Sequence, residues 1–392
     1  MTKKIVLGIV GLLIGAGFGY LFILRPSFLS FQNGKTVLFT ATPERASKNE
    51  IIGFLPYWLA SKADPDYSPY ITQLAYFSLS IDTDGHIQKL TSPVEAEPGW
   101  YALSSGKMDD FLKTAKKNDV ELSLTVFSGD ADLIDQLITT PTQSATNLAS
   151  DILPVMKEHG FTNINLDIEN TREASQSARD NFTIFAKAVE KQLKKIGATM
   201  TVDITGSDLL RPDMIDPKKM GEIADHVMVM TYDYHFAGSI VTGPVAPLGG
   251  AGTIAEYDVK SAIQKAKAVI PSKKIILGAP VYGYEWETLG NTPRSGIIPG
   301  TGITASTKRV QELLSACSTC SAELDSDALE QYLIYQDTET NTYHQIFYPD
   351  QKSTQAKVDF AKHEELGGIG MWALGYEGKE LLNPLKEYKE SL

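Results

Sequence analysis

The sequence predicts an α/β protein built on a (β/α)8 TIM barrel, with a small α+β insertion between the seventh and eighth strands. Strand-like apolar runs alternate with amphipathic helical segments from residue 51 to the C-terminus, and parallel strands need such helical crossovers. Most of these runs end in polar or aromatic residues, as expected where barrel strands converge on a functional mouth. The insertion, at about residues 284–355, is far longer than an ordinary loop.

The expected elements follow one another at regular intervals. Strands are expected at 51–58, 74–79, 122–127, 161–170, 199–204, 227–234, 274–283 and 368–375, and helices at 108–117, 131–159, 175–196, 217–224, 258–269 and 379–388. The insertion contains hairpin-like runs at 331–335 and 343–348. A doubly wound open sheet is the alternative, but it usually has fewer strands and does not explain the polar strand ends.

The first 24 residues predict a membrane anchor. Lys3 and Lys4 precede an uncharged run over residues 5–24, which matches the ~20 residues that cross a bilayer. A cleaved secretory signal is the alternative, but the run is long for one and no A-x-A cleavage site follows. The lysines favour a cytoplasmic N-terminus. We therefore expect a tether at 25–49 and a folded domain at 50–392 that is anchored to the membrane on its extracytoplasmic side. A secreted domain is the alternative.

Composition narrows the possible partners. The 392 residues are 43% hydrophobic and 21% charged, which suits one barrel of ~250 residues with additions. The net charge of -12 comes with no basic cluster, so we expect no nucleic-acid partner. The glycines at 15, 17 and 19 lie inside the apolar run, whereas a phosphate loop needs a strand before it and a helix after it.

The two cysteines, Cys317 and Cys320, form a C-x-x-C pair. A zinc site needs two further ligands, and none stands out nearby. A redox motif would begin a helix after a strand, whereas this pair follows a helical stretch at 307–314. Outside the membrane, a local disulfide is expected. The histidines show no metal-binding spacing, so the sequence predicts neither a metal nor a cofactor.

An acidic pattern marks the fourth strand, at 161–170. Asn165, Asp167 and Glu169 occupy alternate positions, with apolar residues between them. Alternate side chains of a strand point to one face, so two carboxyl groups lie close together. Two such groups do not both ionise freely, and one is expected to hold a proton near neutral pH. The structural alternative is an Asp and a Glu that cap the following helix.

The ends of the other strands predict an aromatic pocket that contains acids. Because barrel strands end at the same face, these residues are expected to converge there: Tyr57, Trp58, Glu169, Asp203, Tyr232, Asp233, Tyr282 and Trp372.

These motifs together resemble glycoside hydrolase family 18, the chitinase-like retaining hydrolases. The acidic strand resembles the D-x-x-D-x-D-x-E signature of that family. Segments 230–233, 278–283 and 371–372 are similar to its motifs on strands six, seven and eight, and the insertion stands where the family has its small insertion domain. Within the family, the chain most resembles the spore-cortex-lytic and peptidoglycan-directed N-acetylglucosaminidases, which often carry Asn at the position of Asn165.

The resemblance implies a glycosidase that needs no metal or cofactor. Glu169 would be the general acid and later the base, while the substrate's own N-acetyl carbonyl attacks C1 and forms an oxazolinium. Asp167 would orient the acetamide, and Tyr232 would bind its oxygen. The remaining expected substrate contacts are Asn165, Asp233, Trp372, Tyr57 and Tyr282. The implied partner is a polysaccharide containing N-acetylglucosamine, either peptidoglycan or chitin-like, with the oligomeric state left unspecified.

The chain departs from the signature at two positions. Thr162 and Asn165 stand where the family has its outer and inner Asp. Asn165 can hydrogen-bond Asp167 but cannot share a negative charge with it, so we expect Asp167 to titrate more simply than in chitinases. A non-catalytic lectin-like barrel is the alternative, although such relatives usually lose the final Glu or the Asp before it. A scaffold for partner proteins at the membrane is a third possibility.

Overall fold

The computed structural model describes residues 29–32, 35–38, 49–170, 172–317, 320–378 and 380–392. The chain divides into two units, Met1–Ser47 and Lys48–Leu392. In the first unit, strands β1 (Leu29–Gln32) and β2 (Lys35–Leu38) form an antiparallel hairpin where the sequence indicated only a tether. The expected anchor at 1–24 lies outside the described residues. Among the helices described, none has the length and apolar character needed to cross a bilayer.

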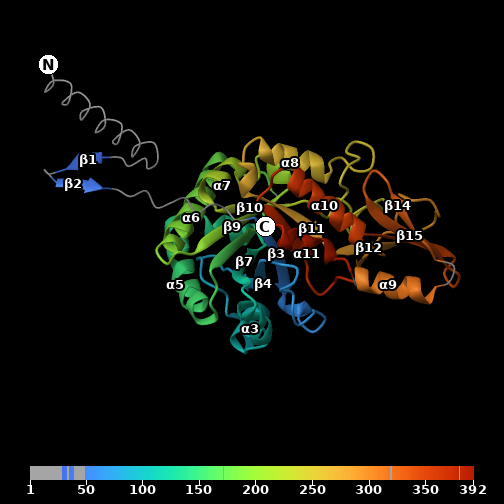
Figure 1. The fold of residues 1–392 in the computed structure, drawn as a ribbon, viewed down its shortest axis with the longest axis horizontal. Helices are drawn as coiled ribbons and strands as arrows, with labels where there is room; N and C mark the ends of the chain where they lie inside the picture. The colour runs from blue at the N-terminus through green and yellow to red at the C-terminus, as the bar shows by residue number, and fades with distance from the viewer. Residues whose placement is uncertain (1–28, 33–34, 39–48, 171, 318–319, 379) are drawn as a thin grey trace, which may run out of the picture. The chain divides into compact units, whose positions relative to one another are not determined.

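Parallel strands close into a barrel in the second unit, which confirms the predicted TIM-barrel architecture (Figure 1). Neighbouring strands follow one another along the chain, so each crossover returns beside the strand it left. The barrel strands are β3 (Glu50–Pro56), β4 (Gln73–Ser80), β7 (Glu121–Ser128), β8 (Asn163–Ile168), β9 (Thr199–Thr205), β10 (His226–Met230), β11 (Ile275–Pro280) and β17 (Gly368–Trp372).

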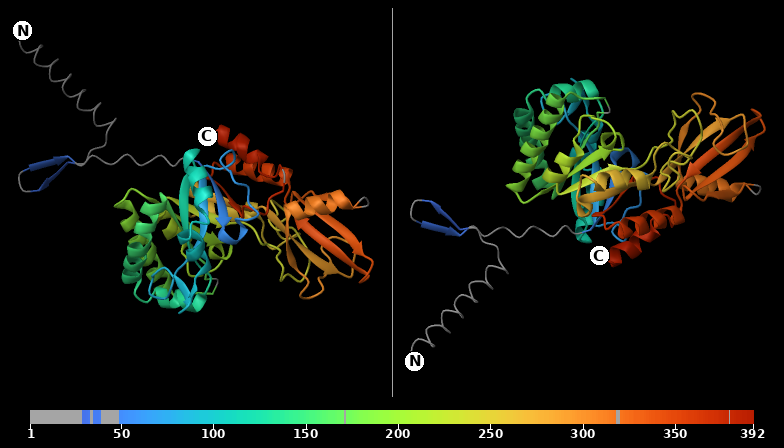
Figure 2. Two further views of the ribbon diagram at one scale, coloured as in Figure 1. Left: turned by 90° about the horizontal axis from the view of Figure 1, so that it is seen from below. Right: turned by 90° about the horizontal axis from the view of Figure 1, so that it is seen from above.

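Helices surround the barrel on its outer side (Figure 2). They are α2 (Pro98–Ser104), α3 (Asp109–Lys117), α4 (Ala131–Leu137), α5 (Pro141–His159), α6 (Gln176–Lys194), α7 (Pro217–Ile223), α8 (Val259–Lys267), α10 (Gln351–His363) and α11 (Asn383–Glu390). The single helix expected at 131–159 is two helices in the structure. The break falls before Pro141, because proline lacks an N–H group and is tolerated in the first turn of a helix better than in its interior.

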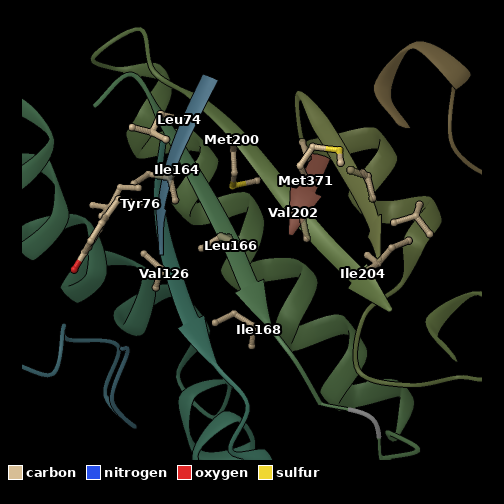
Figure 3. Close-up of a cluster of buried hydrophobic side chains, with 14 of the residues drawn as sticks. Leu74, Tyr76, Val126, Ile164, Leu166, Ile168, Met200, Val202, Ile204 and Met371 are labelled. Carbon is tan, nitrogen blue, oxygen red and sulfur yellow. The ribbon is translucent and has the colours of Figure 1, made fainter. Parts of the chain in front are cut away.

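Strand β8 separates an apolar face from a polar one. Ile164, Leu166 and Ile168 belong to the main hydrophobic core, together with residues of helices α5 and α6 (Figure 3). The alternate residues Asn163, Asn165 and Asp167 are buried on the opposite face, inside the barrel. The outward face anchors the strand by burying apolar surface, at about 25 cal/mol per Å2, and thereby holds the polar face in the interior.

The interior of the barrel is polar on one side and apolar on the other. Its apolar side is formed mainly by β3, β4, β10 and β11, whose inward residues include Phe54, Phe77 and Met228. Its polar side is formed by β7, β8 and β9, whose inward residues are buried and hydrophilic: Ser123, Thr125, Asn163, Asn165, Asp167, Thr201 and Asp203. The chemistry of the site is therefore concentrated on three consecutive strands.

The seventh strand is shorter than expected and ends at Pro280. The chain then leaves the barrel as β12 (Tyr282–Thr288), whose strand partners are antiparallel. Tyr282 thus belongs to the insertion and not to the barrel strand. The insertion is a five-stranded antiparallel sheet in the order β13-β12-β16-β15-β14. Its other elements are β13 (Ile303–Ser306), α9 (Thr307–Ala316), β14 (Ala322–Asp325), β15 (Glu330–Asp337) and β16 (Thr342–Tyr348).

Several shorter elements complete the second unit. They are η1 (Tyr57–Leu59), η2 (Ser207–Leu209), η3 (Ser272–Lys274) and the two-stranded ribbon of β5 (Leu90–Ser92) and β6 (Glu95–Ala96). The disulfide predicted between Cys317 and Cys320 is confirmed, with a Cα–Cα distance of 5.3 Å.

A buried histidine predicts how stability depends on pH. Burial lowers the pKa of His226, the first residue of β10, to about 4, whereas histidine in an unfolded chain titrates near ~6.5. As pH falls, the unfolded chain therefore binds the proton first. The contribution of the neutral imidazole is complete above about pH 6.5 and is lost between about 6.5 and about 4, by on the order of 3 kcal/mol in total.

Urea unfolding at pH 7.5 and pH 5 measures this loss as a difference in free energy of unfolding. We expect the wild type to lose more stability than His226→Gln over this interval. His363→Gln serves as the matched control because the His363 side chain is 82% exposed, and it should behave like the wild type. An equal loss in wild type and His226→Gln would contradict the prediction.

Candidate functional site

Strand β8 carries a ladder of polar side chains up the inside of the barrel. Asn163, at its base, is held on both sides: it accepts a hydrogen bond from the Ser123 hydroxyl at 2.6 Å and donates one to the Thr199 hydroxyl at 2.9 Å. Asn165 and Asp167 follow on the same face, and Glu169 comes directly after the strand. The Glu169 N–H donates to the Ser128 carbonyl at 2.8 Å, which fixes the backbone beside the end of β7.

Asp167 lies deep in the barrel, with only 4% of its surface exposed. Burial raises the pKa of its carboxyl group well above the ordinary value, and the nearby charges of Asp203 and Glu169 raise it further. None of the ion pairs among the described residues includes Asp167. A buried carboxyl with like-charged neighbours and no cation favours its protonated form.

Glu169 is half-buried at the mouth of the barrel. Burial raises the pKa of its carboxyl group, and the charges of Asp208 and Asp233 add to the effect. Asp208, in η2, is itself buried and accepts hydrogen bonds from the Thr205 N–H and hydroxyl, both at 2.7 Å. Burial and two carboxyl groups, which follow the ends of β9 and β10, therefore keep Glu169 protonated to a higher pH than a solvated glutamic acid.

Tyr232 and Asp233 extend the site beyond strand β10. Burial raises the pKa of Tyr232 well above its ordinary value, and the charge of Asp167 is the largest electrostatic contribution. The hydroxyl consequently stays protonated and available as a donor. Asp233 is exposed and has a positive φ of 59°, a conformation that aspartate tolerates better than most residues. Its Oδ1 accepts hydrogen bonds from the hydroxyls of Tyr282 at 2.7 Å and Tyr284 at 3.2 Å.

An aromatic floor faces the acidic side. The Trp372 ring lies edge-on to Phe77, with centroids 4.6 Å apart, and 6.1 Å from Phe54. Trp58 continues this cluster, 5.8 Å from Phe77, and is 46% exposed. Tyr57 contacts the Trp58 ring at 4.9 Å, and the charge of Glu97 adds to burial in raising the pKa of Tyr57. Trp58 therefore lies between Tyr57 and the floor.

A buried ion pair holds the loop that follows Asp233. The Glu330 carboxylate, on β15, accepts hydrogen bonds from the N–H groups of Val245 at 2.8 Å and Ala246 at 3.0 Å. The ammonium group of Lys357, on α10, lies 3.3 Å from the same carboxylate. The Val245 carbonyl in turn accepts the Tyr234 N–H at 3.0 Å. The insertion and α10 thus determine where the end of strand six lies.

The structure brings most of the predicted site residues together. The charges of Asp167 and Glu169 raise the pKa of Tyr232, and that of Glu169 raises the pKa of Asp167. Asn165 lies below them on β8, and Asp233 accepts a hydrogen bond from Tyr282. Sequence reasoning did not select Asp208, Tyr284 or Phe77, and it placed Asp203 only among the strand ends. The signal for Asp203 was present, since Thr199, Thr201 and Asp203 are polar at alternate positions of an otherwise apolar strand.

The expectation that Asp167 titrates more simply than in chitinases stays a prediction. Asn165 carries no charge, but Asp203 on the neighbouring strand supplies a carboxylate that raises the pKa of Asp167. The sequence could not reveal this contact because it lies between two strands and not along one. Among the described residues, no group of three or more His, Cys, Asp or Glu is arranged to hold a metal ion.

Carboxyl groups of raised pKa and aromatic side chains, gathered at the carboxyl ends of parallel barrel strands, are typical of the active site of a barrel enzyme. The chain belongs to the glycosyl hydrolases family 18, whose model matches residues 47–377. It is therefore a chitinase-like glycosidase, and the family resemblance seen in the sequence is confirmed.

Two curated relatives and one solved structure illustrate the similarity. The chain is 26% identical to YdhD of Bacillus subtilis (strain 168), over 83% of this chain and 72% of that protein. YdhD is described as a sporulation-specific glycosylase. It is 25% identical to the cortical fragment-lytic enzyme of the same organism, over 80% of this chain and 67% of that enzyme. The fold matches the Group IV chitinase of Ostrinia furnacalis in complex with allosamidin, with a TM-score of 0.75, 20% identity and coverage of 88% and 99%.

The arrangement of acids predicts that Asp208 tunes Glu169. Asp208→Asn keeps the size of the side chain and an oxygen for the Thr205 N–H, but removes the charge. We expect the pKa of Glu169 to fall, because the largest electrostatic contribution that raises it is gone. Carboxyl 13C NMR titration measures the pKa, with the Glu169 signal assigned by its loss in Glu169→Gln.

Asp180→Asn is the matched control, because Asp180 is an exposed acid on α6. This substitution should leave the titration of Glu169 unchanged. An unchanged or higher pKa for Glu169 in Asp208→Asn would show that the Asp208 charge does not act on it.

Proposed function

We propose that this glycosidase cleaves β-linked glycans that contain N-acetylglucosamine, with retention of configuration and with assistance from the substrate's own acetamido group. The observation that carries the proposal is the grouping of Asp167, Glu169 and Tyr232 around one buried centre. The name of one relative, a cortical fragment-lytic enzyme, supports a peptidoglycan substrate. A chitinase shares the fold, which keeps chitin-like glycans as the second candidate.

In the first step, Glu169 acts as the general acid. Its carboxyl proton passes to the glycosidic oxygen while the bond from that oxygen to C1 breaks. At the same time, the acetamido oxygen forms a bond to C1. This step gives an oxazolinium ion and a Glu169 carboxylate. The raised pKa of Glu169 supports this role, because a general acid must hold its proton at the working pH.

In the second step, the Glu169 carboxylate takes a proton from water as the water oxygen attacks C1. The bond from C1 to the acetamido oxygen breaks, so the acetamide is restored and Glu169 is protonated again. Both displacements occur at C1 from opposite faces, and configuration is therefore retained. Because the nucleophile belongs to the substrate, the reaction becomes intramolecular, which lowers the barrier by several kcal/mol, on the order of 7 or more in favourable cases.

Asp167 and Tyr232 are assigned to the acetamido group. An Asp167 carboxylate would accept the acetamide N–H and stabilise the positive charge that develops on the oxazolinium, an effect that is strong in a site that excludes water. The protonated Tyr232 hydroxyl would donate to the acetamido oxygen and align it with C1. Burial of both side chains supports these roles, since neither group must be stripped of bulk water before it acts.

The remaining site residues are assigned to binding the sugar. Trp372 offers an apolar ring at the floor, which suits the apolar face of a pyranose. Asp233, held by Tyr282 and Tyr284, presents its second carboxylate oxygen to sugar hydroxyls. Asn165 supports the acids from below, and Tyr57 is assigned with Trp58 to a more distant sugar.

A groove beside the site supports a polymeric substrate. It has a volume of about 670 Å3 and is lined by residues at the ends of β4 and β7, including Ser80, Phe127 and Asp130. Phe127 is the register partner of Asp167, so the groove begins next to the acidic centre. A glycan of several sugars would therefore extend from the acidic centre into this groove.

The proposal is tested by incubating the full chain with peptidoglycan and, separately, with chitooligosaccharides. Mass spectrometry of the products should show new N-acetylglucosamine reducing ends from the wild type. Glu169→Gln should lower the rate by about 100-fold or more, since it removes the transferable proton but keeps the shape. The more rapidly cleaved polymer identifies the substrate. Binding of both glycans without cleavage of either would mean that the chain acts as a lectin.

We also propose that the barrel lies outside the cytoplasm, anchored through residues 1–24. Support comes from the uncharged run after Lys3 and Lys4 and from the Cys317–Cys320 disulfide, a bond that persists in oxidising compartments. Protease added to cells without their wall should digest the barrel while a cytoplasmic marker protein survives. Protection of the barrel until the membrane is permeabilised would refute this placement.

A further inference from the structure

The acids on strands β8 and β9 lie side by side. The two strands run in register, with Asn165 beside Thr201 and Leu166 beside Val202. The next residues along the two strands are Asp167 and Asp203, which are therefore lateral neighbours on strands spaced by ~4.8 Å. Both side chains point into the barrel, where 4% of Asp167 and 3% of Asp203 are exposed.

Within the part of the chain that the structure describes, no cation neutralises these two carboxyl groups. Neither takes part in an ion pair among the described residues, and Oδ1 of each is buried without a hydrogen-bond partner there. The other groups that face Asp203 are Asn165 from β8, Glu169 directly after β8, and Tyr232 from the segment after β10. None of these carries a positive charge. Two adjacent buried carboxyl groups do not both ionise at neutral pH, so the pair retains a proton.

Asn165 makes the two members of the pair unequal. Its carboxamide makes no hydrogen bond of regular length and angle within the described residues, yet its proximity lowers the pKa of Asp203 against the larger effect of burial. The charge of Asp203 in turn raises the pKa of Asp167. In the resting enzyme the negative charge is therefore favoured on Asp203 and the proton on Asp167.

We propose that Asp203 is a positioning residue that shares a proton with Asp167. Asn165 stands where the family has its inner Asp and cannot take this role, because it carries no carboxyl group. When positive charge develops on the acetamido group, the O–H bond of Asp167 breaks and one to Asp203 forms. The pair keeps a net charge of minus one throughout, and that charge moves onto the carboxyl next to the intermediate. This inference rests on the proposed function for the role of Asp167, but the sharing of the proton does not.

The sharing is tested without substrate by 13C NMR titration of the Asp167 carboxyl group. In the wild type we expect two steps, because coupled groups titrate as a pair. In Asp203→Asn we expect the upper step to be lost and Asp167 to titrate at lower pH, because only the smaller effect of Glu169 remains. Asp208→Asn changes a buried acid outside the Asp167–Asp203 pair, so the Asp167 carboxyl group should still titrate in two steps. A single step in the wild type would overturn the proposal, and this measurement needs no variant to fold.

The role in catalysis is tested by kinetics on the glycan that the wild type cleaves. Asp203→Asn should lower kcat by about tenfold or more and change KM little, because Asp203 acts through Asp167 and does not touch the sugar. Asn165→Asp combined with Asp203→Asn returns a carboxyl to β8 and should recover a large part of kcat. A simple structural role for Asp203 predicts no recovery in the double variant.

The two tests separate the possible failures. If no glycan is cleaved but Asp167 titrates in two steps, the shared proton stands and the proposed function fails. If cleavage proceeds with equal kcat in the wild type and a folded Asp203→Asn, the proposed function stands and the catalytic role of Asp203 is refuted.

Discussion

The burial of like-charged carboxyl groups inside a closed barrel is the constraint on which the rest of the site depends. Barrel closure brings the ends of β8, β9 and β10 to one mouth and removes their inward side chains from bulk water. Beyond the effect of burial, Asp203 and Glu169 raise the pKa of Asp167, and Glu169 raises the pKa of Asp203. The apolar outer faces of the same strands, packed against helices, offset the cost of holding these groups in the interior.

The interior of the barrel has a polar side and an apolar side, which are formed by different strands. Polar inward residues occupy β7, β8 and β9, while the opposite strands contribute Phe54, Phe77 and Trp372. A sugar ring has the same two-sided character, with hydroxyl groups at its edge and an apolar face. The division therefore suits a carbohydrate better than a uniformly charged or uniformly apolar ligand.

The insertion completes one wall of this site and also fixes it. Tyr282 and Tyr284 come from its first strand and bind Asp233. Glu330, two strands away, holds the loop after strand six through two backbone N–H groups and is neutralised by Lys357. A buried ion pair adds little net stability, but it restricts the loop to one position because any other leaves a charge uncompensated.

The sequence by itself determined the alternation of strands and helices, the acidic face of β8 and the order of the motifs, because these follow from periodicities along a single segment. It did not determine that the seventh strand ends at Pro280 and places Tyr282 in the insertion, since Val281 alone separates the two strands and the sequence shows no break between them. Nor did it reveal the neighbour of Asp167. Asn165 is its neighbour along the chain, but the register between β8 and β9 places Asp203 beside it, and such a register exists only once the barrel has closed.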